Sequence, residues 1–270
     1  MRFTIILVVV ITSVIQSAFS QSTEAPPSGK KMHGSFYLTW GYHGNKYTTS
    51  NIHLKDQVSD SYDFTLYQAK AHDRQDMHNL LSTPISVPQY VFRIGYFFNN
   101  KKDLGVELCW DHLKYIVNDN QVLHLKGTIR ETYYDKDTLV TPGFVHFEHT
   151  NGNNYAMVSA VKRSTFFKPT SGKHKLSGLF SAGAGVLVPK TDSYVLGNHN
   201  DGPFRYSGIV FAASAGLRYE FFKYFYLESS IKGAFADYTN AKVYLQGRAK
   251  HTFFSAQFIY AAGINFPIGK

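Results

Sequence analysis

Hydrophobic and polar residues alternate along several long stretches of the chain. From Ser207 to Phe221 the odd positions are mostly apolar, and the even positions are mostly small or charged. A period of two is typical of a β-strand whose two faces meet different surroundings. The alternation resumes at Phe225 after a short turn, so residues 207–238 predict a hairpin. Each of its strands exceeds the ~9–11 residues that a tilted strand needs to cross a bilayer.

The same alternation predicts five further strands, and residues 154–167 are predicted as a sixth strand whose inward and outward faces are ambiguous. They cover residues 35–43, 89–99, 104–115, 154–167, 176–188 and 254–266. The connections between the eight strands alternate between long and short. Four long loops would therefore lie at one rim and three tight turns at the other, together with both termini. Short periplasmic turns and long outward loops are typical of outer-membrane barrels.

Three segments carry a family resemblance, namely GVELCWDHLKY (residues 105–115), AGAGVLVP (182–189) and AGLRYEFFKYFYLE (215–228). In the order of apolar and polar residues along these segments, the chain resembles small outer-membrane β-barrel proteins of the OmpA type. It also resembles a family of outer-membrane β-barrel domains whose members mostly have no assigned activity. The resemblance covers about residues 33–268. It implies an all-β, closed antiparallel transmembrane barrel, an outer-membrane location and insertion by the barrel-assembly machinery. The chain departs from the usual terminal aromatic residue, because Pro267-Ile268-Gly269-Lys270 follow Phe266.

Strand-like runs also occur inside the long loops, at residues 62–70, 121–131 and 143–149. One interpretation is that they prolong the barrel wall beyond the membrane as hairpins. The alternative is that they add two strands to the barrel and make ten.

The N-terminus has the features of a secretory signal peptide. Met1-Arg2 is a short basic lead, residues 3–15 are mostly apolar, and Ala18-Phe19-Ser20 is a small-x-small cleavage site. The apolar run is too short for a transmembrane helix. We therefore expect a signal peptide over residues 1–20, a flexible lead-in over 21–32 and one barrel domain over 33–268.

Composition favours a membrane environment. Charged residues are 17% of the chain, below the ~25% of ordinary soluble domains, and aromatic residues are 16%. The net charge of +9 favours attraction to outer-membrane lipid and lipopolysaccharide, and an exported chain is not expected to meet nucleic acid. Cys109 is the only cysteine, so no intramolecular disulfide is expected. We expect no cofactor and no bound metal.

Periodicity alone does not say which face of each strand points outward. A soluble lipocalin-like carrier of apolar ligands would bury the apolar face. Gly, Ala and Ser crowd the polar face, which suits a narrow lumen. The apolar face also carries aromatic residues of the kind that form girdles at membrane interfaces, namely Trp40, Tyr42, Tyr90, Tyr96, Trp110, Tyr219 and Tyr260.

An eight-stranded lumen is wide enough only for its own side chains, so a diffusion pore is not expected. The charged residues that would point inward are Arg93, Glu107, Asp111, Arg218, Glu220, Glu228 and Lys232. Buried charges need partners, so we expect a salt-bridge network that plugs the barrel. The alternative is a proton or ion path.

Two small constellations could carry chemistry. His146, Glu148 and His149 lie in FVHFEHT, where Asp111 or His112 could complete a metal or acid/base cluster. The other is His33-Gly34-Ser35, which has the spacing of lipid A deacylase barrels. The simpler interpretation is that these residues face water or the periplasmic rim. The sequence therefore predicts a structural or binding protein of the cell surface, with a lipid-active enzyme or an apolar-ligand carrier as alternatives.

Overall fold

The computed structural model describes residues 34–74, 89–98, 103–171 and 173–268. The predicted signal peptide, the lead-in and His33 lie outside these residues. Every regular element described is a β-strand. No helix in this part of the chain is long and apolar enough to span a membrane.

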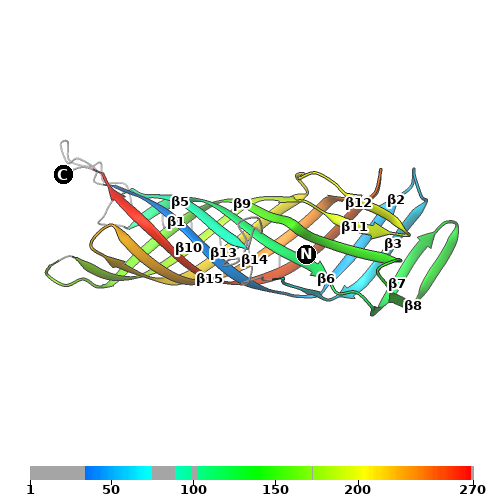
Figure 1. The fold of residues 1–270 in the computed structure, drawn as a ribbon, viewed down its shortest axis with the longest axis horizontal. Coiled ribbons are helices and arrows are strands. Elements are labelled where there is room, and N and C mark those ends of the chain that lie inside the picture. The colour runs from blue at the N-terminus through cyan, green and yellow to red at the C-terminus, as the bar shows by residue number, and fades with distance from the viewer. Residues whose placement is uncertain (1–33, 75–88, 99–102, 172, 269–270) are drawn as a thin grey trace, which may run out of the picture.

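Eight antiparallel strands form a closed ring (Figure 1). In order around the ring they are β1 (Ser35–Tyr47), β5 (Tyr90–Phe97), β6 (Leu104–Val117), β9 (Val145–Phe167), β10 (His174–Pro189), β13 (Gly208–Phe221), β14 (Phe225–Lys242) and β15 (Arg248–Pro267). The ring closes because β1 pairs with β15, from Ser35 opposite Pro267 to Tyr47 opposite Ser255. The predicted eight-stranded barrel is confirmed.

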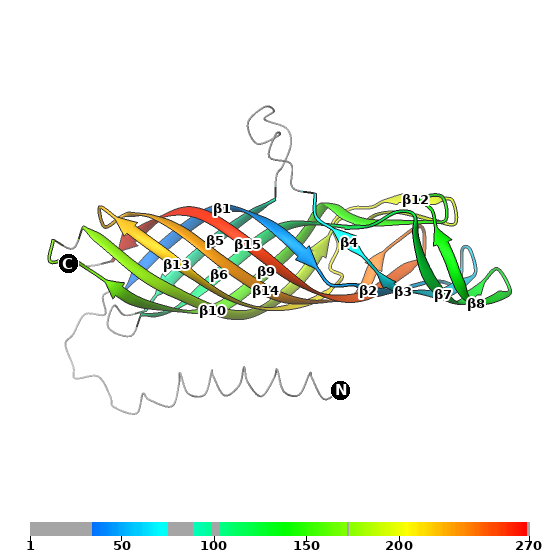
Figure 2. The same cartoon turned by 90° about the horizontal axis from the view of Figure 1, so that it is seen from below.

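The remaining strands stand beyond one end of the barrel (Figures 1 and 2). They are β2 (Ser50–Asp56), β3 (Tyr62–Ala69), β4 (Ala71–His72), β7 (Gln121–Ile129), β8 (Thr132–Val140), β11 (Asp192–Val195) and β12 (Asn198–Asp201). A sheet runs from the start of β15 through β2, β3 and β7 to β8, while β11 pairs with β9 and with β12. The ten-stranded alternative is wrong, because these strands pair above the ring and not within it.

We call this part of the molecule the extension. It comprises β2, β3, β4, β7, β8, β11 and β12, with the adjoining ends of four barrel strands at residues 113–117, 145–153, 238–242 and 248–253. All long connections lie at this end. The start of β1, the end of β15 and the tight β13–β14 turn lie at the other end (Figure 2). The predicted asymmetry of the two rims is therefore confirmed, but the fourth predicted long loop is only residues 243–247, because β14 runs on to Lys242 and β15 already begins at Arg248.

Three local expectations need correction. Residues 189–206, which we expected to be a loop, contain the β11–β12 hairpin. Residues 143–149 are not a separate run, because β9 continues from Val145 through Gly152, whose φ is +140°. The last strand begins at Arg248 rather than at Phe254, because residues 248–250 pair with β2.

In the barrel the apolar side chains point outward and the polar ones inward. On β15, Phe254, Phe258 and Phe266 are exposed, whereas Ser255 and Gln257 are buried. A lipocalin-like carrier would have the opposite arrangement. The outward set forms a band that we call the apolar belt; its exposed members include Phe36, Trp40, Ile94, Val106, Leu108, Trp110, Val158, Phe180, Ile209, Leu217, Leu227, Ile231, Phe254, Phe258, Tyr260 and Phe266.

The belt has the height of a membrane. Twelve residues separate Phe254 from Phe266 on β15. At a rise of ~3.3 Å per residue and a tilt of ~45°, they span about 28 Å along the barrel axis, close to the ~25 Å apolar band of transmembrane barrels.

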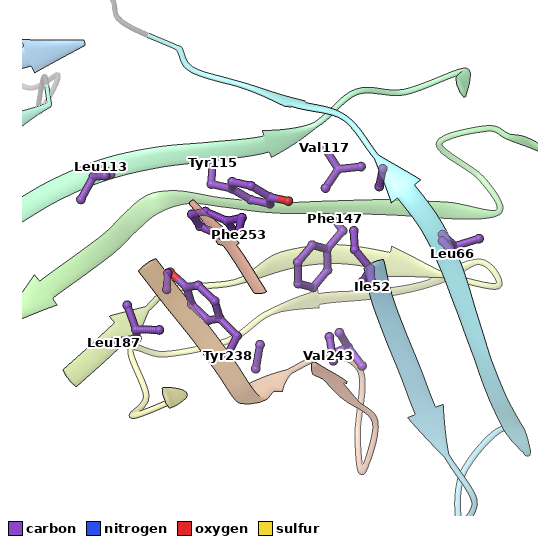
Figure 3. Packing of buried hydrophobic residues seen from close by; sticks show 14 of the residues in the cluster. Ile52, Leu66, Leu113, Tyr115, Val117, Phe147, Leu187, Tyr238, Val243 and Phe253 are labelled. Carbon is purple, nitrogen blue, oxygen red and sulfur yellow. The ribbon is translucent and has the colours of Figure 1, made fainter. Parts of the chain in front are cut away.

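Beyond the apolar belt, toward the extension, the inward-facing side chains become apolar and the outward-facing ones polar. On β6 the inward residues change from Glu107 and Asp111 to Leu113, Tyr115 and Val117, all of them buried. The extension consequently has an apolar core, which Figure 3 shows between β6, β9, β14, β15 and the added strands. Its interior is continuous with the upper lumen, because Tyr155 and Met157 belong to the same cluster.

Candidate functional site

The middle of the lumen holds a cluster of charges from four strands, joined by a tyrosine from a fifth. Glu228 on β14 accepts hydrogen bonds from two arginines. Its carboxylate oxygens lie 2.6 Å from Nη1 of Arg93 and 2.9 Å from Nη2 of Arg218. Arg93 also lies 3.8 Å from Glu107, which accepts a hydrogen bond of 2.7 Å from the hydroxyl of Tyr37. All five side chains are buried. Each carboxylate therefore neutralises at least one guanidinium inside the barrel.

Arg218 is also held by aromatic rings. Its guanidinium carbon lies 3.9 Å from the ring centroid of Tyr226 and 4.6 Å from that of Tyr37. Such cation–π contacts are strongest where water is excluded. Strand alternation predicts that Arg218 points inward, but it gives no indication of these two rings.

A second cluster lies nearer the tight turns. Arg163 contacts Asp103 at 2.7 Å and Glu220 at 3.3 Å, and Lys175 contacts Glu220 at 2.7 Å. Asn265 donates a further hydrogen bond of 3.2 Å to Glu220. Sequence reasoning missed Arg163, because the facing of residues 154–167 was ambiguous, and it missed Lys175 and Asp103, because they were assigned to turns or their edges.

The third cluster lies toward the extension. Nζ of Lys232 is 2.5 Å from Oδ2 of Asp111, and Sγ of Cys109 donates to the other carboxylate oxygen at 2.9 Å. Lys232 also donates to Sγ of Cys109 at 3.7 Å. The lone cysteine is therefore buried and hydrogen-bonded to both members of the Lys232–Asp111 ion pair.

The ion-paired charges of the described lumen balance. The cations are Arg93, Arg163, Lys175, Arg218 and Lys232, and the carboxylates are Asp103, Glu107, Asp111, Glu220 and Glu228. All residues of the predicted inward set are among them. A lumen filled by paired side chains has the chemistry of a plug rather than of a conduction path.

The three candidate catalytic residues lie on opposite faces of strand β9. His146 and Glu148 share the outer face of β9, where Nδ1 of His146 lies 2.8 Å from Asp119 and Nε2 lies 3.5 Å from Glu148. The contacts with Glu148 and Asp119 raise the pKa of His146 to about 9. His146 is thus protonated at neutral pH and is unsuited to act as a general base.

His149 points the other way, into the core of the extension. Its Nε2 lies 3.2 Å from Nε2 of His251, and its Nδ1 lies 3.0 Å from the hydroxyl of Thr191. Burial lowers the pKa of His149 well below its ordinary value, and it lowers that of His251 to about 3. Both imidazoles are therefore neutral and serve packing.

Neither Asp111 nor His112 completes a metal or acid/base cluster with these three residues. Asp111 lies in the lumen beside Lys232, and His112 pairs with Asn154 at 2.8 Å between Nδ1 and Oδ1. Within the described residues no group of three or more His, Cys, Asp or Glu side chains is arranged to hold a metal ion. Asp119, the partner of His146, carried no signal in the sequence because it lies in a turn.

The predicted girdle residues all lie on the outer face. Tyr42 pairs in register with Tyr260 on one side and with Tyr90 on the other. Trp40 stacks on Tyr90 with ring centroids 4.8 Å apart, and Tyr90 stacks on His112 at 5.0 Å. The others are Tyr96, Trp110 and Tyr219, of which Trp110 and Tyr219 are exposed.

A closed antiparallel barrel with an apolar outer belt and a polar, side-chain-filled lumen has the architecture of a small transmembrane β-barrel. No protein-family model matches the sequence, and no curated protein is significantly similar to it.

Solved structures with a similar fold are outer-membrane barrels. Ail of Yersinia pestis is 15% identical, with 87% of this chain and 100% of that chain covered and a TM-score of 0.34. Neisserial surface protein A is 11% identical, with coverages of 85% and 96% and a TM-score of 0.37. OprG from Pseudomonas aeruginosa is 11% identical, with coverages of 87% and 97% and a TM-score of 0.38. Such distant likeness adds no argument about function.

Proposed function

We propose that this chain is an integral outer-membrane protein whose barrel is a closed anchor and whose extension is a binding platform at the cell surface. The observation that carries the proposal is the inversion of the side-chain pattern along single strands. On β15 the outward residues change from Arg248 and Lys250 to Phe254 and Phe258. One strand therefore runs from water into a lipid-like environment.

The interior supports a closed anchor. The lumen charges are paired, and the aromatic core of the extension covers the end of the lumen. Tyr115 and Phe253 stack there with ring centroids 4.4 Å apart, and Tyr238 stacks on His251 at 4.5 Å. A water-filled path would have to displace both the ion pairs and this core.

The orientation follows from the lengths of the connections. In outer-membrane barrels the short turns face the periplasm and the long connections face outward. The extension contains every long connection, so it would stand on the cell surface. A rigid sheet raised above the membrane suits binding, because a β-scaffold holds the connecting loops in fixed positions.

Epitope tags on intact cells test the proposal. A tag in the β2–β3 turn after Gln57, or between Arg130 and Glu131, should be labelled from outside. A tag at Lys223 in the β13–β14 turn should be labelled only after the cells are opened. The protein should also fractionate with outer membranes and migrate faster in detergent gels before heating. Recovery in a wash-released soluble fraction, or labelling of Lys223 alone, would refute the proposal.

Planar-bilayer recordings test the closed lumen separately. We expect no steady conductance from the purified protein. Ohmic current through the unmodified protein would show an open lumen and replace the anchor with a channel.

A further inference from the structure

The outward face of the extension carries a row of cations on three adjacent strands. Lys242 on β14 lies directly opposite Arg248 on β15, and Arg248 lies directly opposite Lys55 on β2. One step nearer the membrane, Lys250 lies opposite His53. Like charges that face each other across a strand pair are destabilising. The fold therefore holds together positive groups that repel one another.

Little on the protein compensates for this charge. Asp63 lies 2.6 Å from Nζ of Lys55 and 2.7 Å from Nε2 of His53. In the ranges that the structure describes, no carboxylate lies within ion-pair distance of Lys242, Arg248 or Lys250. Burial, followed by repulsion from Arg248 and Arg205, lowers the pKa of Lys242.

A recess lies among these cations. Its volume is about 300 Å³, and its lining includes His53, Lys55, Arg248 and Lys250 with the amides of Gln57 and Gln246. This volume is at the lower end of small-molecule sites.

One carboxylate also lines the recess. Asp56 accepts hydrogen bonds from the backbone amides of Val58 and Ser59 at 2.9 and 2.8 Å through a single oxygen, Oδ1. Its side chain is thereby committed to its own turn. The recess is therefore a concave surface lined by the three cations Lys55, Arg248 and Lys250, together with two side-chain amides and the apolar Val58.

The height of the recess indicates the source of its ligand. Lys250 is four residues beyond Phe254, which is about 13 Å along the strand and about 9 Å above the belt at a tilt of ~45°. Each polar layer of a bilayer is about 5–8 Å thick. Lys46, which pairs with Ala256 on the same wall, lies at the edge of the belt itself. The cations thus rise from the head-group layer to just above it.

The opposite wall differs. β9 is four places from β15 in the ring of eight, and its outer face is flanked by Asp119, Glu148 and Asp192. On the β14–β15–β2 face, by contrast, Lys242, Arg248 and Lys55 stand directly opposite one another in the sheet.

We propose that this recess binds the phosphate groups of a phosphorylated glycolipid of the outer leaflet, with Lys55, Arg248 and Lys250 as its main contacts. The inference rests on the proposed function, because the ligand reaches the recess only from the membrane in which the barrel sits. Lys242 and Lys46 extend the positive surface above and below. Such binding should weaken as salt concentration rises.

A titration of the purified full chain in non-ionic detergent tests the site. The probes are lipopolysaccharide with its phosphates and the same material after chemical dephosphorylation. We expect the phosphorylated form to bind at least tenfold more tightly. The triple variant Lys55→Gln/Arg248→Gln/Lys250→Gln should lose about 100-fold in affinity for it, since each cation near an anionic surface contributes about one factor of five. The matched control Lys126→Gln/Lys136→Gln/Lys190→Gln removes the same charge elsewhere on the extension and should keep the affinity.

Two soluble probes separate the possible sources of phosphate and anion. Inorganic pyrophosphate should compete only weakly with phosphorylated lipopolysaccharide, because it lacks the membrane-anchored sugar that carries the phosphates. Binding of pyrophosphate without binding of the glycolipid would overturn the glycolipid as the ligand. Preferential binding of a sulfated polysaccharide, lost in the triple variant, would replace the lipid with a soluble glycan. Equal loss in the control variant would show a non-specific charge effect and would also overturn the site.

Fractionation of the same variants separates this inference from the proposed function. If the wild type is found in the membrane and migrates as a folded barrel but does not distinguish the two glycolipids, the recess alone is refuted. If the wild type is soluble, the proposed function fails first. The triple variant must show the same heat-modifiable migration as the wild type for its loss of binding to count.

Discussion

The barrel and the extension are built from the same strands but place their side chains in opposite ways. Within the belt, β15 turns Phe258 outward and Gln257 inward, whereas a few residues earlier it turns Lys250 outward and Phe253 inward. The backbone pairing continues across this change without interruption, from Tyr238 opposite His251 to Phe225 opposite Ile264. The surroundings of each segment, not the strand itself, decide which face is apolar.

The two regions are therefore stabilised by different forces. In the barrel, lipid surrounds the apolar face, so burial of Leu108 or Phe258 against protein contributes little, and paired charges hold the interior. In the extension, water surrounds the outer face, so the apolar core provides the usual hydrophobic stabilisation of ~25 cal/mol per Å² buried. The same substitution should therefore change the free energy of unfolding by very different amounts in the two regions.

The largest effect should follow from Glu228→Leu in the lumen. Two arginines, Arg93 and Arg218, lose their shared carboxylate. Removal of one side of a buried ion pair typically costs about 3–5 kcal/mol, and we expect the upper end of that range here. Unfolding by urea in lipid vesicles, followed by gel mobility, measures it. Leu108→Ala in the belt is the control and should change the free energy of unfolding much less; an equal effect would show that the ion pairs do not hold the barrel.

Phe147→Ala should produce the next largest effect, in the extension. Phe147 is fully buried, and Phe-to-Ala substitutions in protein cores cost about 3–5 kcal/mol. Protease cleavage between β7 and β8 on intact cells should become faster, while the barrel keeps its heat-modifiable migration. Phe258→Ala, which removes the same ring from the belt, should leave cleavage unchanged. Loss of the barrel in the Phe147 variant would mean that the two regions unfold as one.

The buried imidazoles should make the extension sensitive to acid. His149 and His251 face each other and the neutral rings of Tyr115, Tyr238 and Phe147. Because the folded pKa of each is lowered, their contribution to stability is complete above about pH 6.5 and is lost as the pH falls toward the folded value, about 3 for His251. At pH 5 the loss from His251 should be about 2 kcal/mol, and the lowered pKa of His149 acts in the same direction.

Amide hydrogen exchange between pH 7.5 and 5, corrected for intrinsic rates, measures this loss. Protection should fall at the upper ends of β14 and β15 but not inside the belt. His251→Phe keeps an aromatic ring and should halve the pH dependence. A pH dependence unchanged in this variant would assign the effect to other groups.

The smallest effect should come from Lys250→Leu. This lysine is exposed on the extension, where surface substitutions usually change stability by less than about 0.5 kcal/mol. Lys232→Leu is the matched change inside the lumen, where it would leave Asp111 buried without its cation at a cost of about 3–5 kcal/mol. Urea unfolding of both variants gives the difference directly. Similar values would mean that the lumen is hydrated.

The sequence predicts the ring well because most of its strands alternate over their membrane-spanning length. The choice of the outer face also followed from residues, since Gly and Ser crowd the polar side. The β11–β12 hairpin was missed because its two strands have four residues each and no alternation. The continuity of β9 was missed because Asn151-Gly152-Asn153-Asn154 has the composition of a turn, so residues 143–149 were predicted as a separate run.

The alternation of apolar and polar residues does not predict which charged side chains pair with each other. Alternation places Arg93 and Glu228 on the inner face, but β5 and β14 are not neighbours in the ring, and their contact crosses the lumen. The basic row was also hidden, because Lys55 lies far in the sequence from Lys242 and Arg248. Only the register of the sheet brings them side by side.

The last strand has a consequence for biogenesis. β15 pairs with β14 from Arg248 to Ile264, with β1 through residues 255–267 and with β2 through residues 248–250. Neither the closed ring of the barrel nor the sheet of the extension can be completed until β15 has been delivered. Until then, β1 and β2 each carry an unpaired edge, and unpaired edges are where chains aggregate. A chaperone that shields the N-terminal hairpins during transit would therefore be needed for longer than one that shields the C-terminal ones.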